Sequence, residues 1–276
     1  MLEMLPINGI VKRGNSNMTK PTARPALRLY VRETLVQNST VALNDEQAHY
    51  LFKVMRRSTG DQIGMFNGPS GEVCATLEQT SKKQGVAHIS GQVLPPLLEQ
   101  PTKLALYFSP IKKTPMELIV RQATELGATD LHPTLMEHTR SDNVRYDRLE
   151  AIALEACEQC ERLEPPTLHP PMTLDSILAQ WPDDAPCLVA AEAGDSDSMP
   201  NRLISLKGSP SVAVMIGPEG GFSPREFGQL SSQDSFMMAG LGPRILKAET
   251  AAIAALSIVQ ALWGDAEQRP EFRGQI

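Results

Sequence analysis

Two glycine-rich turns in the last third of the chain hold the residue types best suited to binding and chemistry. GPEGG at residues 217–221 follows the apolar run 211–216, and GPR at residues 242–244 follows the apolar run 236–241. Because glycine has no side chain and adopts positive φ readily, the peptide groups of such turns can approach a bound molecule closely. Both turns are therefore candidate ligand loops, and each is also compatible with a simple tight turn.

The spacing within these turns argues against a phosphate-binding loop. GPEGG lacks the G-x-G-x-x-G pattern of dinucleotide-binding turns, and Glu219 would place a negative charge beside a phosphate. The chain also has no Walker sequence. A ligand with a positive sulfonium suits an acidic loop better than an anionic ligand does. A nucleotide-dependent oxidoreductase that uses the glycine-rich turns is the alternative from another enzyme class.

A few charged side chains are candidates for catalysis. Arg244 in the second turn and Arg140 in the segment HTRS can stabilise negative charge that develops on a substrate oxygen. Glu249 can accept a proton or cap the following helix, whereas the structural role is favoured for Glu125. His138 has the chemistry of a general base, but a single histidine beside a strand end is more often structural.

The four cysteines indicate packing rather than redox or metal chemistry. Cys157 and Cys160 form a C-x-x-C pair, but a zinc site needs further Cys or His ligands, and both thiols fall within an amphipathic helical pattern. Cys74 and Cys187 are isolated, so we expect no disulfide framework. This usage agrees with a reducing compartment such as the cytoplasm. We therefore predict no metal site.

Residues 98–266 have the pattern of a parallel sheet with helices on its faces. The apolar runs 104–108, 187–191, 211–216 and 236–241 alternate with helical segments. In such sheets ligands bind in the crevice beyond the carboxyl ends of the strands. Both glycine-rich turns fall at this edge.

The helices of this region are predicted from their caps and apolar stripes. TPME at 114–117 is a capping box with Pro at the first helical position, and Gly127 ends that helix. SPRE at 223–226 caps a later helix, and a long Ala-rich helix closes the chain. Another helix stops at Pro165-Pro166. Its apolar stripe consists of Leu149, Ile152, Ala153, Ala156, Cys160 and Leu163.

The first part of the chain predicts a small β-barrel. Short strands at 28–31, 63–66, 72–77 and 86–89 are separated by turn residues. One helix interrupts them at Asn44, whose side chain can cap it while Gln47 reaches back. The predicted domains are a flexible extension at 1–25, the barrel at 26–97, the α/β domain at 98–266 and a tail at 267–276.

Charge is unevenly distributed between these parts. Residues 1–97 carry 11 Lys and Arg against 7 Asp and Glu, a net charge of +4, and the remainder carries 15 against 25, a net charge of -10. A basic module that anchors nucleic acid fits this polarity, because phosphate contacts come from local patches. The apolar stretch 251–262 is shorter than the roughly 20 residues that span a bilayer. The amino terminus also lacks a secretory pattern, so we expect no membrane association.

Four segments in this order resemble the RsmE family of ribosomal RNA uridine-N3 methyltransferases, which belong to the SPOUT class. The segments are KKTPMELIVRQATELG, EACEQCER, IGPEGGFSPREF and LGPRILKAETAAIAAL. HYLFKVMR in the barrel resembles the PUA-type RNA-binding domain of the family. The resemblance implies a PUA-like barrel followed by a SPOUT α/β domain with a deep trefoil knot. It further implies a homodimer that uses S-adenosylmethionine to methylate N3 of a uridine in 16S ribosomal RNA, within the small ribosomal subunit.

The resemblance also implies which residues bind the methyl donor. These are Ala190, Ile216, Gly217, Pro218, Glu219, Gly220, Gly221, Leu241, Gly242, Pro243, Leu246 and Thr250. In the implied reaction, uracil N3 attacks the methyl carbon in line and needs either a base or a cation that stabilises charge on the neighbouring carbonyl oxygens. Arg244, Arg140 and Glu249 are the candidates for these roles. Lys247 stands where the family commonly has Arg, which removes bidentate geometry at that position.

Four cations are candidates for RNA contact. Lys112 and Lys113 precede the helix that is predicted to start at Pro115, while Arg56 and Arg57 follow the helix of the barrel. Such residues bind phosphate in many proteins and form a solvated face in others. With 5% aromatic residues, recognition is expected to depend on backbone shape and a single flipped uridine. A catalytically silent RNA-binding assembly factor is the remaining alternative.

Overall fold

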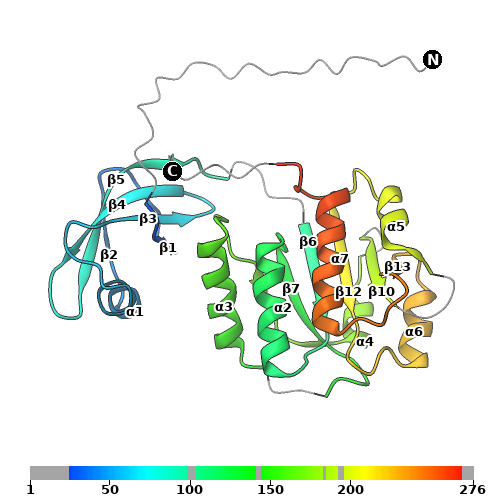
Figure 1. Cartoon of the computed structure of the whole chain (residues 1–276). Helices are drawn as coiled ribbons and strands as arrows, with labels where there is room; N and C mark the ends of the chain where they lie inside the picture. The colour runs from blue at the N-terminus through cyan, green and yellow to red at the C-terminus, as the bar shows by residue number, and fades with distance from the viewer. Residues whose placement is uncertain (1–24, 98–102, 141–143, 183–184, 192–195, 269–276) are drawn as a thin grey trace, which may run out of the picture.

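A computed structural model describes residues 25–97, 103–140, 144–182, 185–191 and 196–268 of the chain. These residues form two sheets, each with its own helices and apolar core (Figure 1). The predicted extension at 1–25 and tail at 267–276 lie almost entirely outside the described residues. The domain boundaries at 97 and 266 stay predictions.

The first sheet has five strands in the order β1-β3-β4-β5-β2, and its pairs are antiparallel except for the parallel pair of β1 and β3. The strands are β1 (Arg28–Tyr30), β2 (Thr40–Ala42), β3 (Gln62–Asn67), β4 (Gly71–Gln79) and β5 (Gly85–Leu94). The strands predicted from the sequence correspond to β1, β3, β4 and β5. β2 was not predicted; only its central residue is buried.

The helix of this domain starts as predicted. It comprises α1 (Asp45–His49) and a π-helical turn, η1 (Tyr50–Val54). The Asn44 side chain accepts a bond from the amide of Gln47 at 2.8 Å, and the Gln47 side chain accepts one from the amide of Asn44 at 3.0 Å. This reciprocal bonding satisfies two N–H groups that the helix leaves without partners. Leu51 then packs into the core of the first sheet.

The second sheet has the strand order β11-β13-β10-β12-β6-β7-β8, and all its pairs are parallel. Its strands, with β9 paired to β7, are β6 (Lys103–Phe108), β7 (Asp130–Leu135), β8 (Thr167–Leu168), β9 (Met172–Thr173), β10 (Cys187–Ala190), β11 (Asp197–Ser198), β12 (Ser211–Ile216) and β13 (Phe236–Gly240). The helices are α2 (Lys113–Glu125), α3 (Tyr146–Gln159), α4 (Leu174–Leu178), α5 (Met199–Ser205), α6 (Pro224–Ser231) and α7 (Ala248–Leu262).

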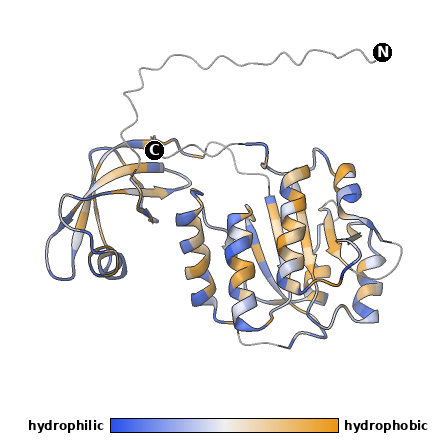
Figure 2. Cartoon of the chain, viewed as in Figure 1, coloured by the Kyte–Doolittle hydropathy of each residue, from blue (hydrophilic) through white to orange (hydrophobic). Residues whose placement is uncertain are grey.

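Helices cover both faces of this sheet and make a three-layer α/β arrangement. The core on one face includes buried residues of α2, α3, α5 and α7, and the core on the other face includes residues of α4 and α6. Figure 2 shows hydrophobic residues along the central strands and along the helices that face them. The α/β class predicted from the sequence is confirmed. Among the described residues no helix has both the length and the apolar character needed to cross a bilayer.

Two helix boundaries differ from the prediction. The predicted box at Thr114 is wrong, because α2 begins at Lys113 and has Lys112 as its N-cap, without a side-chain cap bond. Pro115 therefore lies inside the first turn, where its missing N–H costs nothing. Cys160 and Leu163 lie beyond the end of α3, and Cys157 is buried in place of Cys160. By contrast, the capping box of Ser223 and Glu226 at α6 is confirmed.

The first sheet is joined to the second domain through the side chain of Arg28. Its guanidinium donates to the carbonyl oxygens of Cys157 and Glu158 at 3.1 Å and of Arg162 at 2.9 Å, all at the carboxyl end of α3. The amide of Tyr30 donates to Oε1 of Glu158 at 3.1 Å. Carbonyl groups at the end of a helix lack partners within the helix and carry partial negative charge. The arginine therefore satisfies helix ends of one domain from a strand of the other.

Candidate functional site

Two adjoining cavities open at the carboxyl ends of β10, β12 and β13, the edge that holds both glycine-rich turns. The first cavity has a volume of about 410 Å³ and is bordered by the loop 240–246. The second has a volume of about 920 Å³ and is bordered by residues of the loop 216–222 and by the start of α7. The residues common to both cavities are Ala190, Ala191, Ile245, Leu246 and Ala251.

Most of the residues predicted to contact the methyl donor border these cavities. The first cavity is lined by Ala190, Leu241, Gly242, Pro243 and Leu246 of that set. The second is lined by Ala190, Ile216, Gly217, Pro218, Glu219, Gly221 and Leu246 of that set. Gly220 and Thr250 are not among the described lining residues. Ligand contacts of all these residues stay predictions.

The second glycine-rich turn has a backbone that only glycine adopts without strain. Gly242 has a φ of +106°, a region that L side chains rarely occupy. In the described part of the chain, the main-chain N–H groups of Gly242, Arg244 and Ile245 have no protein acceptor. The loop therefore presents free donors on the border of the first cavity.

The side chain of His138 contacts the main chain of the first glycine-rich turn. Nδ1 of His138 lies 3.1 Å from the carbonyl oxygen of Gly220 and 3.0 Å from that of Gly221. Because both neighbours are acceptors, this nitrogen carries the proton. A Cβ on Gly220 would lie 3.0 Å from the Cβ of His138. The histidine is thus placed to support the turn, which agrees with the structural role favoured from the sequence.

The segment 136–140, which ends in Arg140, is fixed to the neighbouring strand ends by side-chain hydroxyls. Oγ1 of Thr139 lies 2.7 Å from Oγ of Ser109 and accepts the amide of Met136 at 2.8 Å. Ser109 in turn donates its amide to the carbonyl oxygen of Ile216 at 3.2 Å. These bonds connect the carboxyl ends of β6, β7 and β12.

Glu226 contributes a further connection and is only 1% exposed. One carboxylate oxygen accepts the amide of Ser223 at 2.9 Å, within the capping box of α6. The other accepts the amide of Glu137 at 2.8 Å. Hydrogen bonds from backbone amides to a carboxylate are among the strong ones, so the same residue caps α6 and fixes the segment after β7.

Arg225 connects three elements on the surface next to these strand ends. Its guanidinium donates to Glu137 and to Asp175, the latter at 2.8 Å, and so joins α6 to the segment after β7 and to α4. These hydrogen bonds lower the pKa of both carboxyl groups. All three side chains are substantially exposed, so each pair adds little to stability.

The candidates for catalysis divide into two groups. Arg244 borders the first cavity and Glu249, in the first turn of α7, borders the second. Arg140 is exposed at the end of the segment 136–140 and does not line either cavity as described. Glu125 accepts a bond from Gln122 at 2.9 Å on the surface of α2, a structural contact.

The candidates for RNA contact lie in two places. Lys112 borders the second cavity and Lys113 is the first residue of α2. Arg56 and Arg57 follow η1 in the first domain, where Arg56 is exposed. Residues 25–97 carry seven Lys and Arg against six Asp and Glu, so the positive balance of the first 97 residues comes mainly from residues 1–24, outside the described residues.

The C-x-x-C pair is used for packing. Burial raises the pKa of Cys157 to about 12, so its thiol stays protonated and is a poor nucleophile or ligand. Its Sγ lies 3.5 Å from the carbonyl oxygen of Arg162. The guanidinium of Arg162 donates to the carbonyl oxygens of Thr124 and Ala128 at 2.8 and 2.7 Å, and so connects the ends of α2 and α3.

Sequence reasoning missed the residues that support the two loops. Ser109, Thr139 and Glu226 make contacts across 30 to 89 positions of the chain, and local patterns carry no signal for such pairs. The sequence does give one indication that Ser109 belongs to the site, because this residue directly follows the buried end of β6. Ser196, Ser198, Phe222 and Phe227 also border the cavities and were not predicted.

Comparisons with protein families agree with this architecture. Residues 98–260 match the family model of the RNA methyltransferase domain, and residues 43–90 match that of the RNA methyltransferase PUA domain. Ribosomal RNA small subunit methyltransferase E of Rickettsia conorii is 31% identical over 242 residues, which cover 87% of this chain and 98% of the relative. The protein of the same name from Bacillus subtilis is 29% identical over 238 residues, covering 83% and 92%.

Solved structures show the same arrangement of both domains. A putative methyltransferase from Legionella pneumophila, in complex with S-adenosylmethionine, is 31% identical and superposes with a TM-score of 0.78, covering 87% of this chain and 98% of that one. Ribosomal RNA small subunit methyltransferase E from Neisseria gonorrhoeae, bound to S-adenosylmethionine, is 26% identical with a TM-score of 0.74, covering 87% and 99%. From the extent of these matches and the order of its motifs, the chain belongs to the RsmE family of RNA methyltransferases.

Proposed function

We propose that this protein transfers the methyl group of S-adenosylmethionine to N3 of a uridine in small-subunit (16S) ribosomal RNA. The observation that carries the proposal is the pair of adjoining cavities between two glycine-rich loops, at the strand ends where such domains bind ligands. The relatives bound to S-adenosylmethionine and those named as small-subunit methyltransferases support it. The proposed substrate assigns the protein to the cytoplasm.

The residues at the cavities fit a zwitterionic methyl donor. The two volumes, about 410 and 920 Å³, lie within or near the range of roughly 300–1,000 Å³ of small-molecule sites. Free N–H groups in the loop 240–246 can bind an adenine or ribose acceptor. Lys112, Lys247, Glu219 and Glu249 give the second cavity charges of both signs, which suits a ligand that carries a carboxylate, an ammonium and a sulfonium.

The methyl donor, when bound, supplies an activated methyl group on a positively charged sulfur. Uracil N3 is a weak nucleophile while it is protonated, so the enzyme must favour its deprotonated form. Arg244, on the border of the first cavity, would stabilise negative charge on a uracil carbonyl oxygen. Glu249, on the border of the second, would accept the N3 proton. Arg140, outside both cavities, would contact the RNA chain next to the target.

The basic residues of the two domains would bind the RNA backbone. Lys112 lies at the second cavity, where it would hold a phosphate of the flipped nucleotide. Lys113, Arg56 and Arg57 would contact phosphates farther along the RNA. A folded RNA suits this spacing, because the cations belong to two separate domains that are joined firmly at Arg28.

A trefoil knot in the second domain is part of the proposal. The final helix α7 packs against α2, α5 and β12, yet it follows β13, which lies on the far side of β10. The segment 241–247 must therefore cross the carboxyl end of β10, as the final segment of a knotted domain does. We also infer a homodimer and a closed PUA barrel, by family likeness.

A transfer assay tests the proposed reaction. Small ribosomal subunits that lack the modification are incubated with the protein and methyl-labelled S-adenosylmethionine, and the RNA is digested and mapped by mass spectrometry. Label on uridine N3 is expected. Label on a ribose hydroxyl or on guanine would keep the methyl donor and reject the substrate. A silent assembly factor would bind the subunit and transfer no label. Absence of any heat on titration with S-adenosylmethionine would reject the donor itself.

A further inference from the structure

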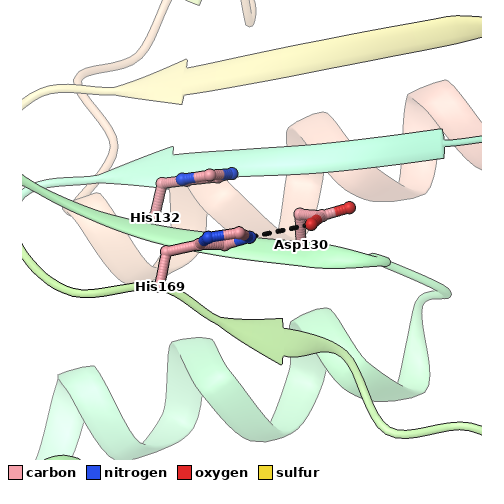
Figure 3. A group of neighbouring side chains, drawn as sticks. All are labelled: Asp130, His132 and His169. Atoms are coloured by element: carbon pink, nitrogen blue, oxygen red, sulfur yellow. Dashed lines mark hydrogen bonds and ion pairs between the residues drawn. The ribbon is translucent and has the colours of Figure 1, made fainter. Parts of the chain in front are cut away.

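Three side chains with metal-binding chemistry lie together on β7 and next to β8, away from the two cavities. Asp130 and His132 are two positions apart on β7, so their side chains point to the same face of the sheet. β7 pairs with β8 at Asp130–Thr167 and Leu131–Leu168. His169 continues this ladder by donating its amide to the carbonyl oxygen of Leu131 at 2.9 Å. The register therefore places His169 beside His132, as Figure 3 shows.

The potential ligand atoms of the three residues are close together. One carboxylate oxygen of Asp130 and one ring nitrogen from each histidine lie within 4.8 Å of one another. Nε2 of His169 lies 2.8 Å from Oδ1 of Asp130. The side chains of His169 and Asp130 keep 34% and 27% of their surface exposed. An ion can therefore reach the group from solvent without opening the core.

We propose that Asp130, His132 and His169 bind a divalent first-row transition ion of the zinc class. Two imidazole nitrogens and one carboxylate oxygen are a common donor set for zinc and related ions. Mg²⁺ and Ca²⁺ do not suit the group, because they prefer ligand sets made of oxygens. Three protein ligands leave at least one coordination position for water. The site was not predicted from the sequence, which gave no sign that His169 lies beside His132.

Ion binding requires a rotation of one ring. The two histidine rings stack with their centroids 3.9 Å apart and their planes at 8°, so their lone pairs run parallel and do not converge. Two nitrogens on one tetrahedral zinc ion lie about 3.3 Å apart, given a Zn–N distance of about 2.0 Å. Rotation about the Cβ–Cγ bond of histidine has broad minima, so the ring can turn at small cost. The ion then replaces the bond between His169 and Asp130.

Neighbouring residues already orient two of the ligands. The hydroxyl of Thr129 donates to Oδ2 of Asp130 at 2.9 Å, which leaves Oδ1 directed at His169. The ring of Tyr107 stacks on His132 with centroids 4.2 Å apart and planes at 5°. Such outer contacts hold ligands in place and increase metal affinity in known sites.

The ion would stabilise the edge of the sheet and take no part in methyl transfer. β8 has only two residues, so it is held to β7 by few main-chain bonds. An ion between Asp130 and His169 would join the two strands, and binding would add to the free energy of unfolding. None of the three residues lines either cavity as described.

The test uses the full-length protein without an affinity tag, freed of metal by chelation. Titration with Zn²⁺ in a calorimeter should show one ion per chain, and Co²⁺ should give the visible absorption of a four- or five-coordinate site with imidazole ligands. Zn²⁺ should also raise the melting temperature. His132→Phe, which keeps an aromatic ring against Tyr107, and His169→Gln should each weaken binding by more than about 100-fold, since a ligand is lost rather than an outer contact.

Two control variants distinguish Zn²⁺ binding at this site from binding by another histidine or by a thiol of the chain. His88→Gln removes a histidine of the first sheet that pairs with Glu78, and its Zn²⁺ affinity should equal that of the unchanged protein. Cys160→Ser removes the most accessible described thiol and should also leave affinity unchanged. The proposal is overturned if no stoichiometric ion binds, or if binding survives in both His132→Phe and His169→Gln. Loss of binding in Cys160→Ser overturns it as well. Should His132→Phe fail to fold, His169→Gln decides the question.

Discussion

Nε of Arg28 donates to Oε2 of Glu72 at 2.9 Å, and neither side chain is exposed to solvent. The same guanidinium bonds the carboxyl end of α3 and lies over the ring of Phe66 at 3.8 Å. A buried ion pair adds little net stability over an apolar pair, but loss of one partner leaves a charge buried alone. One arginine side chain therefore contributes both to the fold of the first sheet and to its attachment to α3.

We expect Arg28→Met to lower the free energy of unfolding by about 3–5 kcal/mol, the usual cost of breaking a buried ion pair by removing one of its partners. Urea denaturation measures the change. Arg32→Met, at an exposed arginine four residues along the chain, is the matched control and should alter stability by less than about 0.5 kcal/mol. Equal effects of the two substitutions would show that the buried pair has no special role.

The joint between the domains should also respond to pH through Glu158. Burial raises the pKa of this carboxyl from 4.5 to about 7, against the opposing effects of the Tyr30 amide and Arg28. Because the folded state binds the proton more tightly, its contribution to stability is complete below pH 4.5 and is lost as pH rises through about 7. With about 1.4 kcal/mol per pKa unit and partial exposure of the group, the loss should be about 2 kcal/mol.

Denaturation of the protein and of Glu158→Gln across pH 4 to 9 checks this expectation. The stability difference in favour of Glu158→Gln should grow between pH 4.5 and 7 and stay constant above pH 8. Glu150→Gln, an exposed glutamate on the same helix, should follow the unchanged protein at every pH. A difference that does not vary with pH would contradict the assignment.

Gly242→Ala should weaken binding of S-adenosylmethionine by about tenfold or more. An alanine at a φ of +106° is strained by roughly 1–3 kcal/mol, so the loop 240–246 would leave the conformation that presents its free amides. Gly228→Ala is the control, because Gly228 lies in α6 with open space around it and alanine favours helix. Calorimetry on both variants measures the effect; unchanged affinity in Gly242→Ala would separate this loop from the donor.

Glu226→Gln should destabilise the protein by about 1–3 kcal/mol, because one of the two amides bound by the carboxylate would face an amide donor instead. Methyl transfer should fall as well, since the segment 136–140 loses its main-chain bond to α6. Asp234→Asn, an exposed residue after α6, serves as control in thermal denaturation and in the transfer assay. A fully active Glu226→Gln variant of normal stability would remove the residue from this role.

Arg244→Ala is expected to lower the rate of methyl transfer by about 100-fold, the effect of losing one donor that stabilises developing charge. Affinity for S-adenosylmethionine should change by less than about threefold. Single-turnover rates and calorimetry separate the two quantities, with Lys207→Ala as an exposed-cation control beyond α5. Lost donor affinity with an unchanged rate of the chemical step would reassign Arg244 to donor binding.

The parts of the site that could be predicted from the sequence are those determined by residues that are neighbours along the chain. A buried strand followed by glycine marks each ligand loop, so the positions of Gly217 and Gly242 followed from a few neighbouring residues. The capping boxes at Asn44 and Ser223 were predicted for the same reason. The start of α2 was not predicted correctly. Thr114 has the residue type of an N-cap, but the helix starts at Lys113 and has no side-chain cap bond.

The contacts that join strand ends could not be predicted from local patterns. His138 reaches Gly220 across 82 positions, and the buried bond between Glu226 and the amide of Glu137 depends on the order of strands β6, β7 and β12. Strands of two or three residues such as β8 and β11 show no periodicity. Their positions are set by pairing with longer neighbours, which only the folded chain reveals.

The bonds from Arg28 to the end of α3 leave the two domains without a free hinge at this contact. We therefore do not expect the five-stranded domain to swing inward around the proposed RNA. Selection between substrates then falls to the curvature of the RNA, which must already present a uridine at the correct separation from its anchoring phosphates. If the substrate is the small subunit proposed above, a particle whose RNA has a different shape would be rejected before any base is read.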